Sequence, residues 1–211
     1  LERFPPSLVG ARKLTDFNAS GNVLKLIPQC IMGFSVLKSL RLSNNSLQKL
    51  PMGFDCFFFL QTLDLSNNHF CEVNDTLGNL QDLRNLNLSH NRISKMPLQL
   101  PKSLETLDLS YNLLNEFSYE LPKLRSLHLA FNPLQTLKQD LTNLKYLSTA
   151  FTSLEQSDSL QTRFRIGVTS TIGLRMTMED TSVFRTFDSK ELYAVFDGHM
   201  GNECSKQGAK I

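Results

Sequence analysis

The side chains best suited to chemistry lie towards the C-terminal end of the chain, around Asp197. Residues 192–196 (LYAVF), directly before it, are apolar on both faces, which predicts a central strand covered on two sides. A carboxylate at the mouth of such a strand is costly unless a cation or hydrogen bonds compensate for its burial. Gly198 and His199 follow Asp197. The pattern therefore indicates a polar site where this strand ends.

A second group of charged residues, Arg175, Glu179 and Asp180, precedes this strand. Alternation along the segment places Arg175 and Glu179 on one face, with Asp180 on the other face or in a turn. Carboxylates that meet near one strand mouth suit a hard divalent cation, and an arginine close by suits a phosphate. The two groups together predict a site for metal and phosphate.

These residues resemble the metal-dependent Ser/Thr phosphatases of type 2C. The matching residues are Gly173, Arg175, residues 178–180 (MED), residues 195–199 (VFDGH) and Gly201. The resemblance implies two Mg²⁺ or Mn²⁺ ions, with Asp197 bridging them and the Gly198 carbonyl binding one. Glu179 and Asp180 would hold metal directly or through water.

The resemblance also implies a reaction, the hydrolysis of phosphoserine and phosphothreonine. Arg175 would bind the substrate phosphate, and a metal-bound water would attack phosphorus in line. His199 would protonate the departing Ser or Thr oxygen, without a phosphoenzyme intermediate. Met200 departs from the family pattern, which has glycine there. Only residues 164–211 of the domain are present, without its later Asp ligands, so we expect this segment alone to be inactive.

Residues 14–154 carry a different pattern, the recurring frame L-x-x-L-x-L-x-x-N-x-L. It opens at Leu14, Leu37, Leu60, Leu83, Leu104, Leu124 and Leu144, so successive frames are 20 to 23 residues apart. This period resembles that of leucine-rich repeats. The L-x-L core has the period of a strand with one buried face. One strand per repeat predicts a parallel sheet on the concave side, with short helices and loops on the convex side.

The frame asparagine predicts a buried ladder, because an amide offers both a donor and an acceptor to neighbouring backbones. Its members are Asn22, Asn45, Asn68, Asn91, Asn112 and Asn132, and Thr152 takes the position in the last repeat. The segments that return from one strand to the next shorten towards the C-terminus, so less helix is expected there. Residues 51–60 are the best candidate for a helix, and we interpret residues 57–59 (FFF) as core rather than as a self-association patch.

Two rows of frame positions are expected to face solvent on the strands. In the second row, Tyr111, Phe131 and Phe151 become aromatic towards the C-terminus, and His128 belongs to the first row. Aromatic anchors beside polar residues favour protein interfaces, so these four residues are candidates for partner binding on the concave face. The alternative is that each ring packs on its neighbour in the stack. The histidines lack a second ligand at metal-binding spacing and are interpreted as surface residues.

The composition indicates which classes of partner the chain is not built to bind. The 22 basic and 20 acidic residues are interspersed and give a net charge of +2, which does not favour nucleic acid. No apolar run has the length of a membrane span, which needs roughly 20 residues. The four cysteines lack metal-ligand spacing and are expected to be free thiols. We therefore predict a cytoplasmic protein.

The sequence divides into three parts. Residues 1–155 are expected to form an α/β leucine-rich-repeat solenoid, residues 156–163 a linker, and residues 164–211 the start of a type 2C phosphatase domain of the α+β, β-sandwich class. The leading hypothesis is a signalling phosphatase whose repeats bind a protein partner and whose substrate is a phosphoprotein. The alternatives are a scaffold with a degenerate phosphatase-like domain, and part of a larger adenylyl cyclase.

Overall fold

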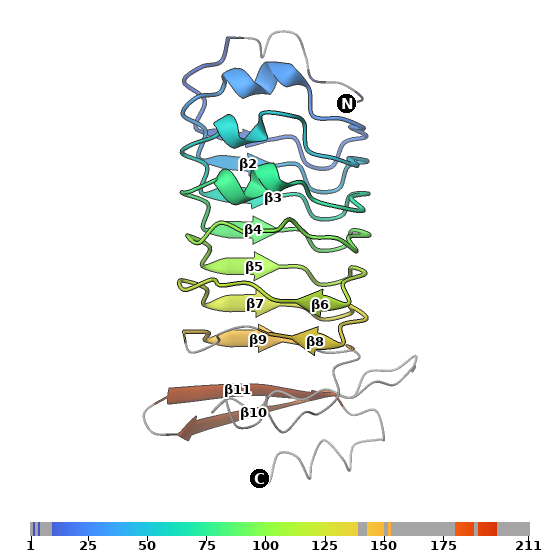
Figure 1. Cartoon of the computed structure of the whole chain (residues 1–211), viewed down its shortest axis with the longest axis vertical. Helices are drawn as coiled ribbons and strands as arrows, with labels where there is room; N and C mark the ends of the chain where they lie inside the picture. The colour runs from blue at the N-terminus through green and yellow to red at the C-terminus, as the bar shows by residue number, and fades with distance from the viewer. Residues whose placement is uncertain are drawn as a thin grey trace.

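The structure is a computed structural model. It describes residues 2, 4, 10–138, 143–149, 152, 180–187 and 190–197, the last two ranges as backbone only. The dominant feature is one sheet of seven parallel strands stacked along the length of the array (Figure 1). In sheet order the strands are β1 (Asp16–Asn18), β2 (Ser39–Arg41), β3 (Thr62–Asp64), β4 (Asn85–Asn87), β5 (Thr106–Asp108), β7 (Ser126–His128) and β9 (Tyr146–Ser148).

The register of this sheet follows the sequence frame. Leu40 lies opposite Leu63 and Leu63 opposite Leu86, so equivalent residues of successive repeats are neighbours in space. Leu40, Leu63 and Leu86 occupy the middle of their three-residue strands and are buried. The seven predicted strands are therefore confirmed, and alternation leaves the first and last residue of each strand to face the other way.

The returning segments change character along the chain. The three 23-residue repeats carry 3₁₀ helices, namely η2 (Gln29–Gly33), η3 (Phe54–Cys56) and η4 (Asp75–Asn79). The described residues of the next repeats, of 20 or 21 residues, carry extended pieces instead, with β6 (Glu116–Phe117) parallel to β8 (Thr136–Leu137). A bridge joins Glu72, in the third of the 23-residue repeats, to Lys95 in the repeat that follows. A chain with fewer residues must extend, because a 3₁₀ helix rises about 2.0 Å per residue and a strand about 3.3 Å.

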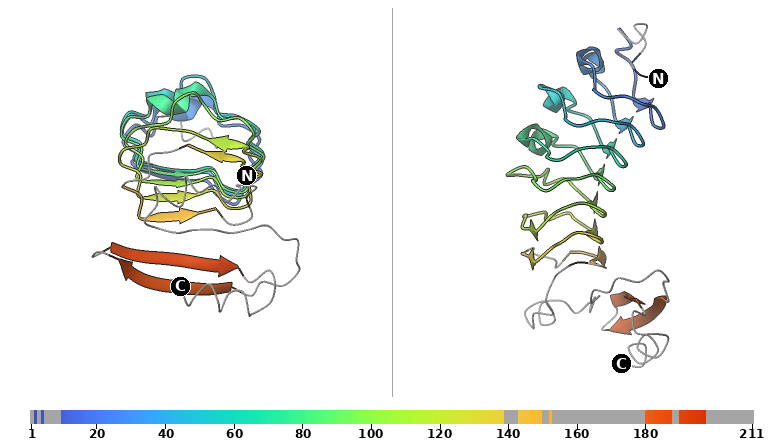
Figure 2. Two further views of the ribbon diagram at one scale, coloured as in Figure 1. Left: turned by 60° about the horizontal axis from the view of Figure 1, so that its bottom comes forward. Right: turned by 90° about the vertical axis from the view of Figure 1, so that its right-hand side faces the viewer.

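This difference bends the array. The helical returns stand apart on the convex side while the strands remain close together (Figure 2, right). The expected loss of helix towards the C-terminus is confirmed. The helix expected within residues 51–60 is only the three-residue η3, and the described residues contain no α-helix, so the array is a β-solenoid rather than an α/β structure.

The core lies between the sheet and the returns. Frame leucines line it continuously, and Phe34, Phe54, Phe57, Phe70 and Phe117 fill the wider parts at less than 2% exposure.

Our interpretation of residues 57–59 as core was wrong for two of the three side chains. Phe57 is 1% exposed, whereas Phe58 and Phe59 are 68% and 51% exposed. The chain turns here to enter β3, and a turn cannot direct three successive side chains inward.

No helix of the described residues is long and apolar enough to cross a membrane.

The C-terminal part contributes an antiparallel pair, β10 (Asp180–Phe187) and β11 (Lys190–Asp197). This confirms the strands expected at 181–187 and 192–196. The expected strand at 165–170 and the linker 156–163 lie outside the described residues.

Candidate protein interface

The chain turns at a ladder asparagine in successive repeats. The Asn68 amide donates to the carbonyls of Leu42, Leu65 and Ser66 at 3.0 to 3.1 Å, and its Oδ1 accepts the Leu47 N–H at 2.9 Å. Asn45, Asn91, Asn112 and Asn132 make the same kinds of bond. The predicted ladder is therefore confirmed across these repeats.

The ladder also ends as expected. In the last repeat Thr152 is 2% exposed and its hydroxyl donates to the Thr149 carbonyl at 2.9 Å.

The residue before each ladder asparagine adopts a left-handed backbone. Asn44, Asn67, His90, Tyr111 and Phe131 have φ between 52° and 56°. This conformation is uncommon for residues other than glycine. It is held by bonds between repeats, as when the Tyr111 N–H donates to the Ala130 carbonyl at 2.9 Å. The repeated turn thereby places these side chains one above another.

Three of these side chains form a stack of rings. The His90 and Tyr111 ring centroids are 4.1 Å apart, as are those of Tyr111 and Phe131, and both pairs are nearly parallel. Tyr111 remains 42% exposed. The rings predicted to bind a partner thus stack on one another, as the alternative interpretation holds, and they offer their edges to solvent. Phe151 lies outside the described residues.

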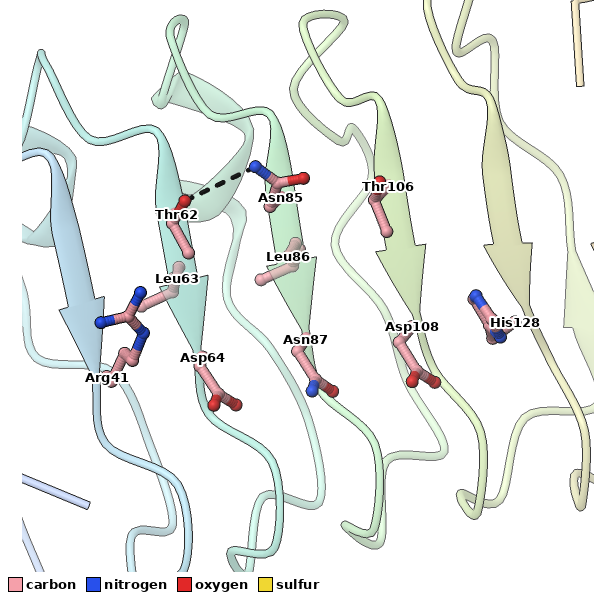
Figure 3. A pocket seen from close by; sticks show the side chains of 10 residues that line it. All are labelled: Arg41, Thr62, Leu63, Asp64, Asn85, Leu86, Asn87, Thr106, Asp108 and His128. Carbon is pink, nitrogen blue, oxygen red and sulfur yellow. Dashed lines mark hydrogen bonds between the residues drawn. The ribbon is translucent and has the colours of Figure 1, made fainter. Parts of the chain in front are cut away.

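The concave face also presents the first of the two predicted rows, formed by the last residues of successive strands. We call Arg41, Asp64, Asn87, Asp108 and His128 the concave strip. They line a shallow depression of about 270 Å³, together with the row of Thr62, Asn85 and Thr106. The close-up shows Asp64, Asn87 and Asp108 lying in parallel at the ends of their strands (Figure 3).

Local turns fix the three central members of the concave strip. Asp64 Oδ1 accepts the backbone N–H of Ser66 at 3.0 Å and its hydroxyl at 2.7 Å. Asp108 is bound in the same way by Ser110 at 2.9 and 2.6 Å, and Asn87 by Ser89 at 3.0 and 2.8 Å. The signal in the sequence is an Asp or Asn followed two residues later by Ser, a turn that we did not predict.

His128 is the last member of the concave strip. Its Nε2 lies 3.0 Å from the Ser126 hydroxyl, and its ring centroid is 4.8 Å from that of Tyr146 on the neighbouring strand. Among the described residues, no group of three His, Cys, Asp or Glu side chains is placed to hold a metal ion. His128 is therefore placed on the predicted concave face, as a hydrogen-bonded polar residue.

Comparison with known families agrees with this geometry. A leucine-rich-repeat family model matches residues 81–134, and a second one matches residues 36–57 and 59–80.

The array is a leucine-rich-repeat solenoid.

Solved leucine-rich-repeat structures share this fold. The leucine-rich-repeat domain of APL1B matches with a TM-score of 0.69 and 25% identity, over 76% of this chain and 48% of that domain. The LRIM1/APL1C complex matches with a TM-score of 0.65 and 28% identity, over 71% of this chain and 29% of the other.

A sequence relative matches over a shorter part of the array. Toll-like receptor 2 type-2 of Gallus gallus is 39% identical over 61 residues, which are 29% of this chain and 8% of the receptor. The chain thus spans only part of the proteins it matches.

The predicted metal site lies beyond the leucine-rich-repeat array. Of its residues, Asp180 and Asp197 belong to the described backbone, where they are directly opposite each other in the β10–β11 register. Arg175, Glu179, Gly198 and His199 lie outside the described residues. The pairing brings together two of the carboxylate-bearing positions that the sequence separates.

Proposed function

We propose that the leucine-rich repeats bind a protein partner on the concave face and bring it to a metal-dependent Ser/Thr phosphatase domain that begins within residues 164–211. The observation that carries the first half is the concave strip, whose polar side chains lie in one row on an open sheet face. Leucine-rich repeats are typical of protein-interaction scaffolds, which supports this assignment.

The phosphatase half is supported by the motif residues and by the register of β10 and β11. Like charges directly opposite each other destabilise an antiparallel pair. Asp180 and Asp197 occupy such positions in the backbone register, so a bound divalent cation would offset the repulsion. The donor set therefore fits Mg²⁺ or Mn²⁺, held by Asp197, Asp180, Glu179 and the Gly198 carbonyl. Bound metal would supply an acidified water for attack on phosphorus.

The remaining two residues of the predicted site, Arg175 and His199, would act on the substrate. Arg175 would orient the substrate phosphate through paired N–H donors. His199 would give a proton to the leaving oxygen. Both roles are proposals from the resemblance, whereas a cytoplasmic location is proposed from the composition. Cys30, Cys56 and Cys71 are free thiols in the part of the chain that the structure describes, which favours a reducing compartment.

The catalytic half is tested on the full-length protein with a phosphothreonine peptide and Mn²⁺. We expect Asp197→Asn to abolish hydrolysis while the circular dichroism spectrum stays unchanged. His199→Ala should slow a phosphopeptide more than an aryl phosphate, whose leaving group needs little protonation. Hydrolysis that survives in Asp197→Asn would remove this residue from the mechanism. A wild-type protein without hydrolysis would favour the non-catalytic scaffold.

The binding half is tested by comparing proteins captured by three forms of the full-length chain. Asn85→Arg places a bulky charge in the middle of the concave face, and Leu98→Glu changes an exposed residue, 87% accessible, of a returning segment. A partner on the concave face should be lost with Asn85→Arg and kept with Leu98→Glu. Equal capture by both variants would contradict a concave binding site.

A further inference from the structure

We propose that the concave strip receives a helix of the partner protein, lying along the solenoid axis, with basic side chains at two positions seven residues apart. This inference rests on the proposed use of the concave face and specifies the partner's chemistry. It follows from three properties of the concave strip, which are its rigidity, its spacing and its charge.

Rigidity comes from the Asp–Ser and Asn–Ser turns. In Asp64 and Asp108, Oδ1 is bound by serine, so Oδ2 is the acceptor that remains for a partner. In Asn87 the oxygen is bound in the same way, which leaves the amide NH₂ as a donor. The concave strip therefore alternates acceptor, donor and acceptor on three successive strands. Groups that are fixed before binding lose little conformational entropy when a partner docks.

The spacing selects a helix over an extended strand. Adjacent strands lie about 4.8 Å apart, which places Asp64 and Asp108 at roughly twice that spacing, about 9.6 Å. On a helix, residues i and i+3 are separated by about 4.5 Å along the axis, and i and i+7 by about 10.5 Å. On an extended strand, side chains of one face repeat at about 6.7 Å and match neither interval.

The charge pattern defines which side chains the helix carries. Among the described residues, Arg41, Asp64 and Asp108 form no salt bridge, whereas nearby Arg84 pairs with Glu105 at 3.6 Å. The row beside the concave strip, formed by the first strand residues Thr62, Asn85 and Thr106, is uncharged. Two unpaired carboxylates thus call for Lys or Arg at i and i+7. One arginine, a strand before Asp64, calls for Glu or Asp at i−4 or i−3.

The test uses two alanine-based helical peptides of equal composition, labelled for fluorescence anisotropy and titrated with the whole chain. The matched peptide has Lys at i and i+7 and Glu at i−4, and the swapped peptide has the same three residues with Lys at i−4 and i and Glu at i+7. We expect the matched peptide to bind about tenfold more tightly, since complementary rows attract it and like charges repel the other. The preference should weaken as ionic strength rises.

The decisive variant is Asp64→Asn with Asp108→Asn. It removes both charges while keeping the turns, because an asparagine can accept the same kind of bond. Asn18 and Asn87 each accept the backbone N–H of the serine two residues later, at 3.0 Å. The preference should fall to within about twofold. The matched control, Asp55→Asn with Asp82→Asn, removes the same charge from positions outside the concave strip and should keep the preference.

Three results would overturn the inference. These are equal affinity of the two peptides, a preference that survives in Asp64→Asn with Asp108→Asn, and equally tight binding of a proline-interrupted peptide that cannot form the helix. A natural partner that is lost with Asn85→Arg but still binds the double variant normally would refute the basic helix and leave the proposed function intact. A partner unaffected by Asn85→Arg would refute the proposed function itself.

Discussion

Replacing the ladder residue Asn68 by alanine should destabilise the array through one backbone group in particular. Asn68 is 4% exposed and makes four bonds to backbone atoms. Three of its partners are carbonyls with a second donor, since Leu42 also accepts from Asn45, Leu65 from Asn91, and Ser66 from the Asn44 N–H. Among the residues that the structure describes, the Leu47 N–H bonds to Asn68 alone. The alanine variant therefore leaves one buried donor without a partner.

The magnitude follows from these bonds. An unsatisfied buried donor costs about 1 to 3 kcal/mol, and each hydrogen bond lost to a group that keeps another partner costs about 1 kcal/mol or less. The space left by the amide adds a further small loss of packing. We expect Asn68→Ala to lower the free energy of unfolding by about 2 to 4 kcal/mol, most of it from the Leu47 N–H.

Urea unfolding of the whole chain, followed by far-ultraviolet circular dichroism, measures this loss. Asn85→Ala is the matched control, since it removes the same amide from an exposed strand position and should change stability by about 0.5 kcal/mol or less. Asn68→Asp separates hydrogen bonding from packing. It keeps the shape but faces three carbonyls with a carboxylate, so it should destabilise as well. A stable Asn68→Asp variant, or an alanine variant within experimental error of the wild type, would refute this account of the ladder.

Three further perturbations test other parts of the fold. In Gly78→Ala the new Cβ would lie 2.7 Å from the Gln99 backbone oxygen, so thermal unfolding should show a loss of about 1 to 3 kcal/mol. Asn67 has φ of 52°, a left-handed conformation that a β-branched residue resists and glycine adopts freely. Asn67→Val should therefore lower the free energy of unfolding, measured in urea, by about 1 to 3 kcal/mol, whereas Asn67→Gly should be tolerated. Burial, with smaller contributions from Glu116 and Asp75, raises the pKa of Tyr119 from 10.0 to about 12. The raised value means that its contribution to stability is complete below pH 10 and lost as the pH rises towards 12, and Tyr119→Phe should remove that component.

The sequence predicted the parts of the fold that repeat. A frame with two constraints per repeat, buried leucines and a buried amide, leaves one arrangement in which all of them are satisfied. The strands, the ladder and the loss of helix in the shorter returns follow from it. The burial of side chains in turns could not be predicted from the frame. Phe58 and Phe59 lie in a turn, where no strand or helix period determines whether an apolar side chain faces the core.

The candidate sites were predictable to different degrees. The concave face followed from alternation. The fixed geometry of Asp64 and Asp108 depends on serines two residues later, a local signal that neither metal-ligand spacing nor aromatic anchors reveal. For the metal site, the sequence left Asp180 on either face or in a turn. The strand register places it opposite Asp197, because pairing between strands decides which residues meet.

The solenoid separates the residues that hold it together from those that a partner can recognise. The ladder residues Asn45, Asn68, Asn112 and Asn132 are buried. The last strand residue, in contrast, is Asn18, Arg41, Asp64, Asn87, Asp108, His128 or Ser148 in different repeats of one fold. Exchanging Asp64 and Asn87 should therefore leave the free energy of unfolding within about 0.5 kcal/mol, since either side chain accepts the serine N–H.

The exchange should nevertheless change recognition. It moves one carboxylate to the strand beside Asp108, so the two acceptors would lie about 4.8 Å apart instead of twice that distance. A peptide with Lys at i and i+3 should then bind more tightly than one with Lys at i and i+7. Retention of the original preference would show that the concave strip is not read strand by strand, and a large loss of stability would show that the position is structural after all.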